Sequence, residues 1–101
     1  MWKDVIELGN LEEYAEYGEV LQQFVYRKVY ANKQSVRQSE FYQSATTGLK
    51  PELVFEIRSV EFSNEEKIRY NGKEYSIIRA YDKGETVELT VSSHIGSEVS
   101  G

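Results

Sequence analysis

The sequence has no cysteine, one histidine and one proline among 101 residues. Without cysteine it can form no disulfide, thiolate metal site or cysteine nucleophile. The single histidine, His94, cannot build a site of several histidine ligands. No apolar run approaches the roughly 20 residues of a membrane span, and the first residues resemble neither a signal peptide nor a transit peptide. We therefore expect a chain made in the cytoplasm, with no cofactor, no metal and no membrane partner.

Common catalytic motifs are missing as well. There is no glycine-rich phosphate loop, no G-x-S-x-G and no H-E-x-x-H. The pairs Glu12–Glu13 and Glu65–Glu66 are poor candidates for a two-carboxylate site, because neighbouring side chains point apart on a helix or a strand. We expect that the protein is not an enzyme.

The net charge of −5 is concentrated at the start of the chain. Residues 1–20 hold six acidic side chains and one lysine, whereas residues 21–101 hold equal numbers of acids and bases. Tight nucleic-acid binding needs clustered lysine and arginine, and no such cluster is present. An acidic segment repels phosphate and anionic lipid. A plain solvated acidic loop would carry the same charges.

Alternating apolar residues predict short antiparallel strands around one core. The chain is of single-domain size, with 40% hydrophobic residues. The clearest signal is Asn71-Gly72, two residues that tolerate the positive φ of a type I′ hairpin turn. A two-residue loop there pairs Tyr70 with Lys73 and Arg69 with Glu74. A second hairpin is expected at residues 81–85, with Gly84 in the left-handed position and Leu89 on the buried face of the following strand.

The remaining elements are predicted from weaker patterns. Strands are expected at residues 2–8, 24–31 and 53–58, with a bulge or strand break near Ser59. Residues 9–22 read as an acidic connection with a helical turn at residues 11–15, and residues 38–45 fit one short helix. The fold class is therefore mainly β: a small antiparallel barrel or roll with one short helix. Residues 1–93 form the domain and residues 94–101 a polar tail.

Aromatic residues exceed what this small core needs. The chain has eight tyrosines, and the strand at residues 24–31 is apolar on both faces. Tyrosine suits surfaces that become half-buried against a partner, although it also favours strands in general. The surplus side chains are candidates for a subunit interface: Tyr14, Tyr17, Phe24, Tyr26 and Tyr30.

Four stretches together resemble the head–tail joining proteins, the small head-closure or stopper proteins of long-tailed phages and prophages. They are Val29-Tyr30-Ala31-Asn32, Ser39-Glu40-Phe41-Tyr42-Gln43-Ser44-Ala45, Ile68-Arg69-Tyr70-Asn71-Gly72-Lys73-Glu74-Tyr75-Ser76-Ile77 and Val87-Glu88-Leu89. The resemblance covers residues 1–93 in the family's order. Members of the family often carry a further proline or glycine where this chain has Lys33-Gln34-Ser35-Val36.

The resemblance implies a structural virion protein. Such a protein forms a ring below the portal and its adaptor, closes the DNA channel after packaging and docks the tail. Its expected partners are the portal or adaptor protein, tail proteins, further copies of itself, and double-stranded DNA that passes without sequence-specific binding. The chain would be made in the host cytoplasm and reside in the virion connector. Glu12, Glu13, Glu16 and Glu19 are then candidates for a channel or gating loop.

Two other functions remain open at this point. A small β-barrel can bind a peptide or single-stranded nucleic acid through an aromatic face, although the charge argues against nucleic acid. A different tail-completion protein of the same virion is the third possibility. Under the connector hypothesis, the isolated chain is monomeric or weakly associating and forms a ring only on a preformed connector.

Overall fold

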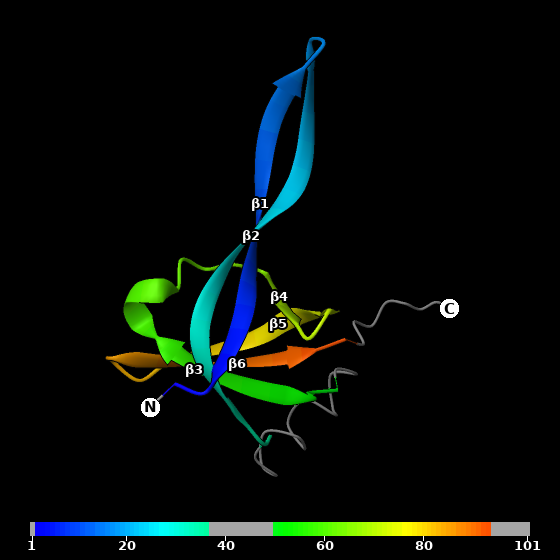
Figure 1. Ribbon diagram of the computed structural model, residues 1–101. Coiled ribbons are helices and arrows are strands. Elements are labelled where there is room, and N and C mark those ends of the chain that lie inside the picture. Colours follow the sequence, from blue (N-terminus) through cyan, green and yellow to red (C-terminus); the bar gives the residue numbers. More distant parts are fainter. Residues whose placement is uncertain (1, 37–49, 94–101) are drawn as a thin grey trace.

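The computed structural model describes residues 2–36 and 50–93, which form a closed antiparallel β-barrel. The strands are β1 (Asp4–Glu16), β2 (Glu19–Gln34), β3 (Leu53–Arg58), β4 (Lys67–Tyr70), β5 (Lys73–Asp82) and β6 (Thr86–Ser92). Around the barrel they follow the order β1-β2-β3-β6-β5-β4, and β4 closes onto β1 (Figure 1). The predicted fold class, a mainly β antiparallel barrel, is confirmed. The helix predicted at residues 38–45 and the tail at residues 94–101 lie outside the described residues.

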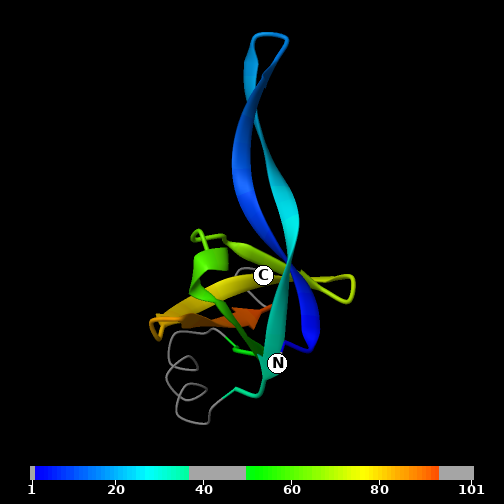
Figure 2. The same ribbon diagram turned by 60° about the vertical axis from the view of Figure 1, so that its left-hand side comes forward.

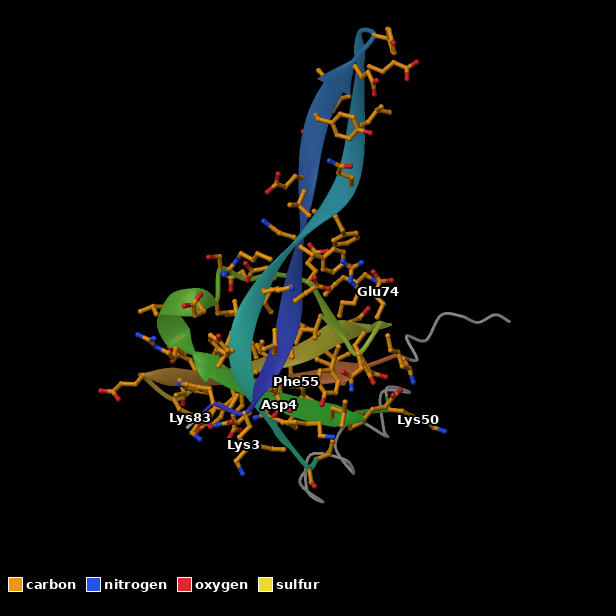
Figure 3. All side chains as sticks on the ribbon, in the orientation of Figure 1. Lys3, Asp4, Lys50, Phe55, Glu74 and Lys83 are labelled. Carbon is orange, nitrogen blue, oxygen red and sulfur yellow. The ribbon has the colours of Figure 1, made fainter. Side chains whose placement is uncertain are left out.

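The barrel interior is filled by aliphatic side chains around one phenylalanine. Phe55, on β3, is fully buried and lies within the barrel (Figure 3). Its ring meets the edge of the Tyr70 ring, with 5.0 Å between centroids. The predicted buried face of β6 is confirmed, since Val87, Leu89 and Val91 are all buried. Glu88 and Thr90 between them are buried as well. Further buried side chains come from β1 to β5: Ile6, Leu8, Val29, Ala31, Ile57, Ile68 and Tyr75.

Both predicted hairpins form. Asn71 and Gly72 have φ of 53° and 78°, as a type I′ turn requires, and the register pairs Tyr70 with Lys73 and Arg69 with Glu74. Gly84 has φ of 103°, and its N–H donates to Asp82 Oδ1 at 2.8 Å. The strand break near Ser59 is also confirmed, because β3 ends at Arg58 and a 3₁₀ turn, Ser59–Glu61, follows.

The most distinctive feature is a two-stranded arm that projects from the barrel (Figures 1 and 2). β1 pairs with β4 only through Glu7, Leu8 and Gly9, and β2 pairs with β3 only from Asn32 onward. Beyond Gly9, residues 10–25 pair only with each other, and the chain turns at Tyr17-Gly18. We call residues 10–25 the arm.

The arm corrects the sequence prediction for residues 9–22. The expected connection with a helical turn at residues 11–15 is wrong, because these residues are strand in β1 and β2. The strands already paired in the barrel continue their antiparallel register outward without a break, from Asp4↔Ala31 to Glu16↔Glu19. The predicted strands at residues 2–8 and 24–31 are therefore parts of longer ones. Within the described residues, no helix is long and apolar enough to cross a membrane.

Candidate functional site

The arm carries most of the net charge of the protein. Residues 10–25 contain four glutamates and no lysine or arginine, which accounts for four of the five net negative charges. These four are the sequence-predicted channel residues: Glu12, Glu13, Glu16 and Glu19. The structure places them together, but on the strands of a projecting ribbon rather than in a loop.

The acidic side chains are distributed over both faces of the ribbon. Glu13 accepts a hydrogen bond from Gln22 Nε2 at 3.5 Å. Glu16 is paired directly with Glu19 across the two strands, in the last pair before the turn. Like charges placed directly opposite each other destabilise an antiparallel pair. The tip therefore concentrates negative charge at a cost to its own stability.

Tyr17 occupies the turn of the arm in an unfavourable conformation. Its φ is 53°, a left-handed value that costs a bulky residue about 1–3 kcal/mol. The equivalent position of the other two-residue hairpin is held by Asn71, which tolerates such values. The Tyr17 side chain is 96% exposed, so no internal packing offsets the strain. Backbone strain of this kind is often retained where a side chain serves function.

At the base of the arm, four side chains from four strands form a brace. Tyr26 on β2 lies over Gly9 on β1, and its hydroxyl donates a hydrogen bond to Glu74 on β5. The Arg69 guanidinium stacks on the Tyr26 ring, 3.9 Å from its centroid, and Arg69 Nε donates to Glu7 Oε1 at 2.7 Å. Figure 3 shows Glu74 beside the point where the arm leaves the barrel. We call Tyr26, Arg69, Glu74 and Glu7 the brace.

The brace alters the ionisation of its tyrosine. Partial burial and, second, the hydrogen bond to Glu74 raise the pKa of Tyr26 to about 12. The hydrogen bond to Glu7 raises the pKa of Arg69 above its ordinary value. Phe24 lies next to the brace, and its ring centroid is 6.4 Å from that of Tyr26. Lys67 Nζ lies 5.6 Å from the centroid of the Phe24 ring. These contacts fix how the arm leaves the barrel.

The five candidate interface aromatics therefore fall into two groups. Tyr26 and Phe24 are half-buried by β4 and β5 side chains of their own chain, as described above. Tyr14, Tyr17 and Tyr30 are exposed to 40%, 96% and 68%. Tyr14 and Tyr17 lie on the arm, whereas Tyr30 lies on the barrel part of β2, opposite Val5. Only this second group presents open aromatic surface.

Tyr30 borders a surface hollow that the sequence did not single out. Val5, Lys28, Val29 and Tyr30 line an open hollow of about 330 Å³ on the barrel part of the β1–β2 pair. Val5 is 49% exposed. Lys28 lies opposite Glu7, but the carboxylate of Glu7 is bound by Arg69, and Lys28 forms no ion pair with any described residue. The Val5↔Tyr30 pairing would have revealed this surface if the strand register had been known.

Within residues 2–36 and 50–93, no group of three or more histidine, aspartate or glutamate side chains could hold a metal ion. Buried side-chain polar atoms in the same ranges all have hydrogen-bond partners. We take the arm and the hollow together as the candidate site, because of the exposed surface that they offer. Comparison with protein-family models gives no match to this chain, and comparison with curated protein sequences gives none either.

Proposed function

We propose that the protein is a structural component of a phage head–tail connector. It forms a ring below the portal or adaptor protein, closes the DNA channel after packaging and presents a surface to the tail. The resemblance of the four sequence stretches to head-closure proteins suggests this assignment. The observation that supports it best is the acidic arm, a paired ribbon that reaches away from its own domain.

An arm of this kind fits contacts outside the domain that bears it. Residues 10–25 add almost nothing to the barrel core, because the core residues of β1 and β2 end at Leu8 and begin again at Val29. The ordered register and the brace give the arm a defined direction. A ring of such subunits would project identical arms at a fixed angle, toward the channel or toward a neighbouring protein.

The charge of the arm is compatible with a DNA channel. The arm has four glutamates and no lysine or arginine of its own, so it repels phosphate, and DNA meets no binding site on the arm as it passes. Contact with double-stranded DNA in the channel would then be steric and independent of base sequence. The alternative function, a barrel that binds single-stranded nucleic acid, needs the opposite charge on its exposed surface.

DNA retention tests this proposal. Heads are packaged without the chain, purified chain is added, and the DNA that becomes accessible to nuclease is measured. We expect heads without the chain to lose DNA and heads with it to retain DNA. Equal loss in both samples contradicts the proposal. Oligonucleotide binding that weakens steeply with salt would favour the alternative function instead.

A further inference from the structure

We propose that the tip of the arm docks into the hollow at Val5, Lys28 and Tyr30 of a second copy of this chain. Tyr17 is the anchor of this contact, and Glu16 and Glu19 lie on either side of it. The inference rests on the proposed function, because the ring is where two copies would meet. It identifies the contact between neighbouring subunits of that ring. The contact itself depends only on residues of this chain.

The arm tip has the properties of a binding anchor. Tyr17 is almost fully exposed and is held at a positive φ that Asn or Gly would adopt more easily. Exposed tyrosines that become buried are frequent centres of protein–protein interfaces. The turn therefore retains a residue that weakens the hairpin but offers a large amphipathic side chain at its end.

The hollow offers complementary chemistry. Val5 and Tyr30 give it apolar walls, and its volume of about 330 Å³ has room for an aromatic ring. Lys28 lies at the same hollow and has no acidic partner among the described residues. Glu16 and Glu19, which repel each other across the turn, would both gain from a nearby cation. Docking thus places the unpaired acids of one copy beside the unpaired base of another.

Geometry and charge identify the second copy as the partner. Tyr17 directly follows β1 and is 12 residues from Val5, which is about 40 Å at the usual rise of a strand. The tip therefore cannot fold back onto its own hollow. Pairing of two arms is disfavoured, because each carries four negative charges and no positive one.

The proposed contact joins two different surfaces. Each copy contributes its tip to one neighbour and its hollow to another, which is a heterologous interface. Such contacts continue from copy to copy and close into a ring when the rotation between neighbours permits. A symmetric dimer through the arms would leave the hollow empty. The arrangement is therefore of the type that the proposed function requires.

Charge reversal in the isolated chain tests the contact. Self-association is measured by sedimentation equilibrium up to about 1 mM, the range of weak contacts. We expect Glu19→Lys and Lys28→Glu each to reduce the association constant about tenfold, and the double variant to recover it. Glu19→Lys combined with Lys50→Glu is the matched control, because Lys50 precedes β3 and does not line the hollow. That control should not recover association.

Tyr17→Asn provides the second variant. It removes the anchor but gives the turn the same Asn-Gly sequence as residues 71–72, so the hairpin should fold at least as well. We expect association to fall about tenfold with no loss of thermal stability. The proposal is overturned if the wild-type chain does not associate, if Tyr17→Asn has no effect, or if the double charge reversal fails to recover association.

These results are separable from the test of the proposed function. If the chain associates as described but heads do not retain DNA, the connector function is wrong and the contact stands. If heads retain DNA while the charge reversals change nothing, the connector function stands and subunits meet through another surface.

Discussion

The ring of Tyr26 lies against the backbone of Gly9, so that a Cβ atom at Gly9 would stand 2.5 Å from Cε1 of Tyr26. The absence of a side chain at Gly9 lets Tyr26 extend from β2 across β1 to reach Glu74 on β5. An aromatic ring that covers a strand glycine in this way also replaces packing that glycine lacks. The contact links the base of the arm on β2 to β5, which lies beyond β1 and β4 in the barrel.

Replacement of Gly9 by alanine should therefore destabilise the protein. The new methyl group must displace a ring that Glu74 and Arg69 hold in place, and we expect a loss of about 1–3 kcal/mol in the free energy of unfolding. Denaturant melts measure this loss. In a Tyr26→Ala background, Gly9→Ala should be neutral or stabilising, because the clash is gone and alanine suits a strand better than glycine. The same cost in both backgrounds would show that the ring contact is not its cause.

Alkaline pH should weaken the brace. The pKa of Tyr26 is about 12 in the folded chain and 10.0 when unperturbed, so folding favours the protonated phenol. Its contribution to stability is complete below about pH 10 and is lost as the pH rises toward 12. Melts of the wild type and of Tyr26→Phe across this range measure the difference. We expect the two stabilities to converge with rising pH, whereas parallel curves would contradict the assignment.

Truncation of the core should be costly. Leu89 is fully buried on β6, and Leu89→Ala is expected to cost about 2–5 kcal/mol in denaturant melts. Val60 is 80% exposed, so Val60→Ala is the control and should change stability by less than about 0.5 kcal/mol. A loss below about 1 kcal/mol at Leu89 would mean that this face of β6 does not look into the core.

The ion pair between Arg27 and Glu65 should contribute more to stability than an exposed ion pair does. The Glu65 side chain is 3% exposed and accepts a hydrogen bond from Arg27 Nη2 at 2.8 Å. Arg27→Met leaves that carboxylate without its cation, and we expect a loss of about 1–3 kcal/mol. Lys73→Met is the control, since Lys73 is 57% exposed and lies 3.9 Å from Glu52. It should cost less than about 1 kcal/mol. An equal loss of stability in the two variants would show that the burial of Glu65 does not strengthen its ion pair.

Local turn chemistry made the barrel hairpins predictable from the sequence. Asn71-Gly72 admits positive φ at both positions, and a two-residue loop leaves one register for the flanking strands. Gly84 similarly marks the second hairpin. The alternation of Val87, Leu89 and Val91 predicted the buried face of β6. Glu88 and Thr90 are also buried there, which a period of two residues does not reveal.

The arm escaped prediction because its residues favour a strand only weakly. Tyr17-Gly18 lacks the usual first residue of a type I′ turn, and Glu12 and Glu13 are poor strand formers. The strands form because pairing inside the barrel extends outward along one register. The sequence identified the acidic and aromatic residues of the arm, but not that Tyr26 and Phe24 are covered by Arg69 and Lys67. Those contacts bring together residues more than 40 positions apart.

Removal of the arm tests most directly the claim that it serves contacts outside the barrel. Asn10 and Val25 are paired, so replacing residues 11–24 by Asn-Gly closes the hairpin with a two-residue turn. Uptake of this variant into connectors is measured against the wild type, with circular dichroism and cooperative melting as checks of the barrel. We predict that the shortened chain keeps its β-barrel and fails to enter connectors. Uptake at the wild-type level would contradict the account.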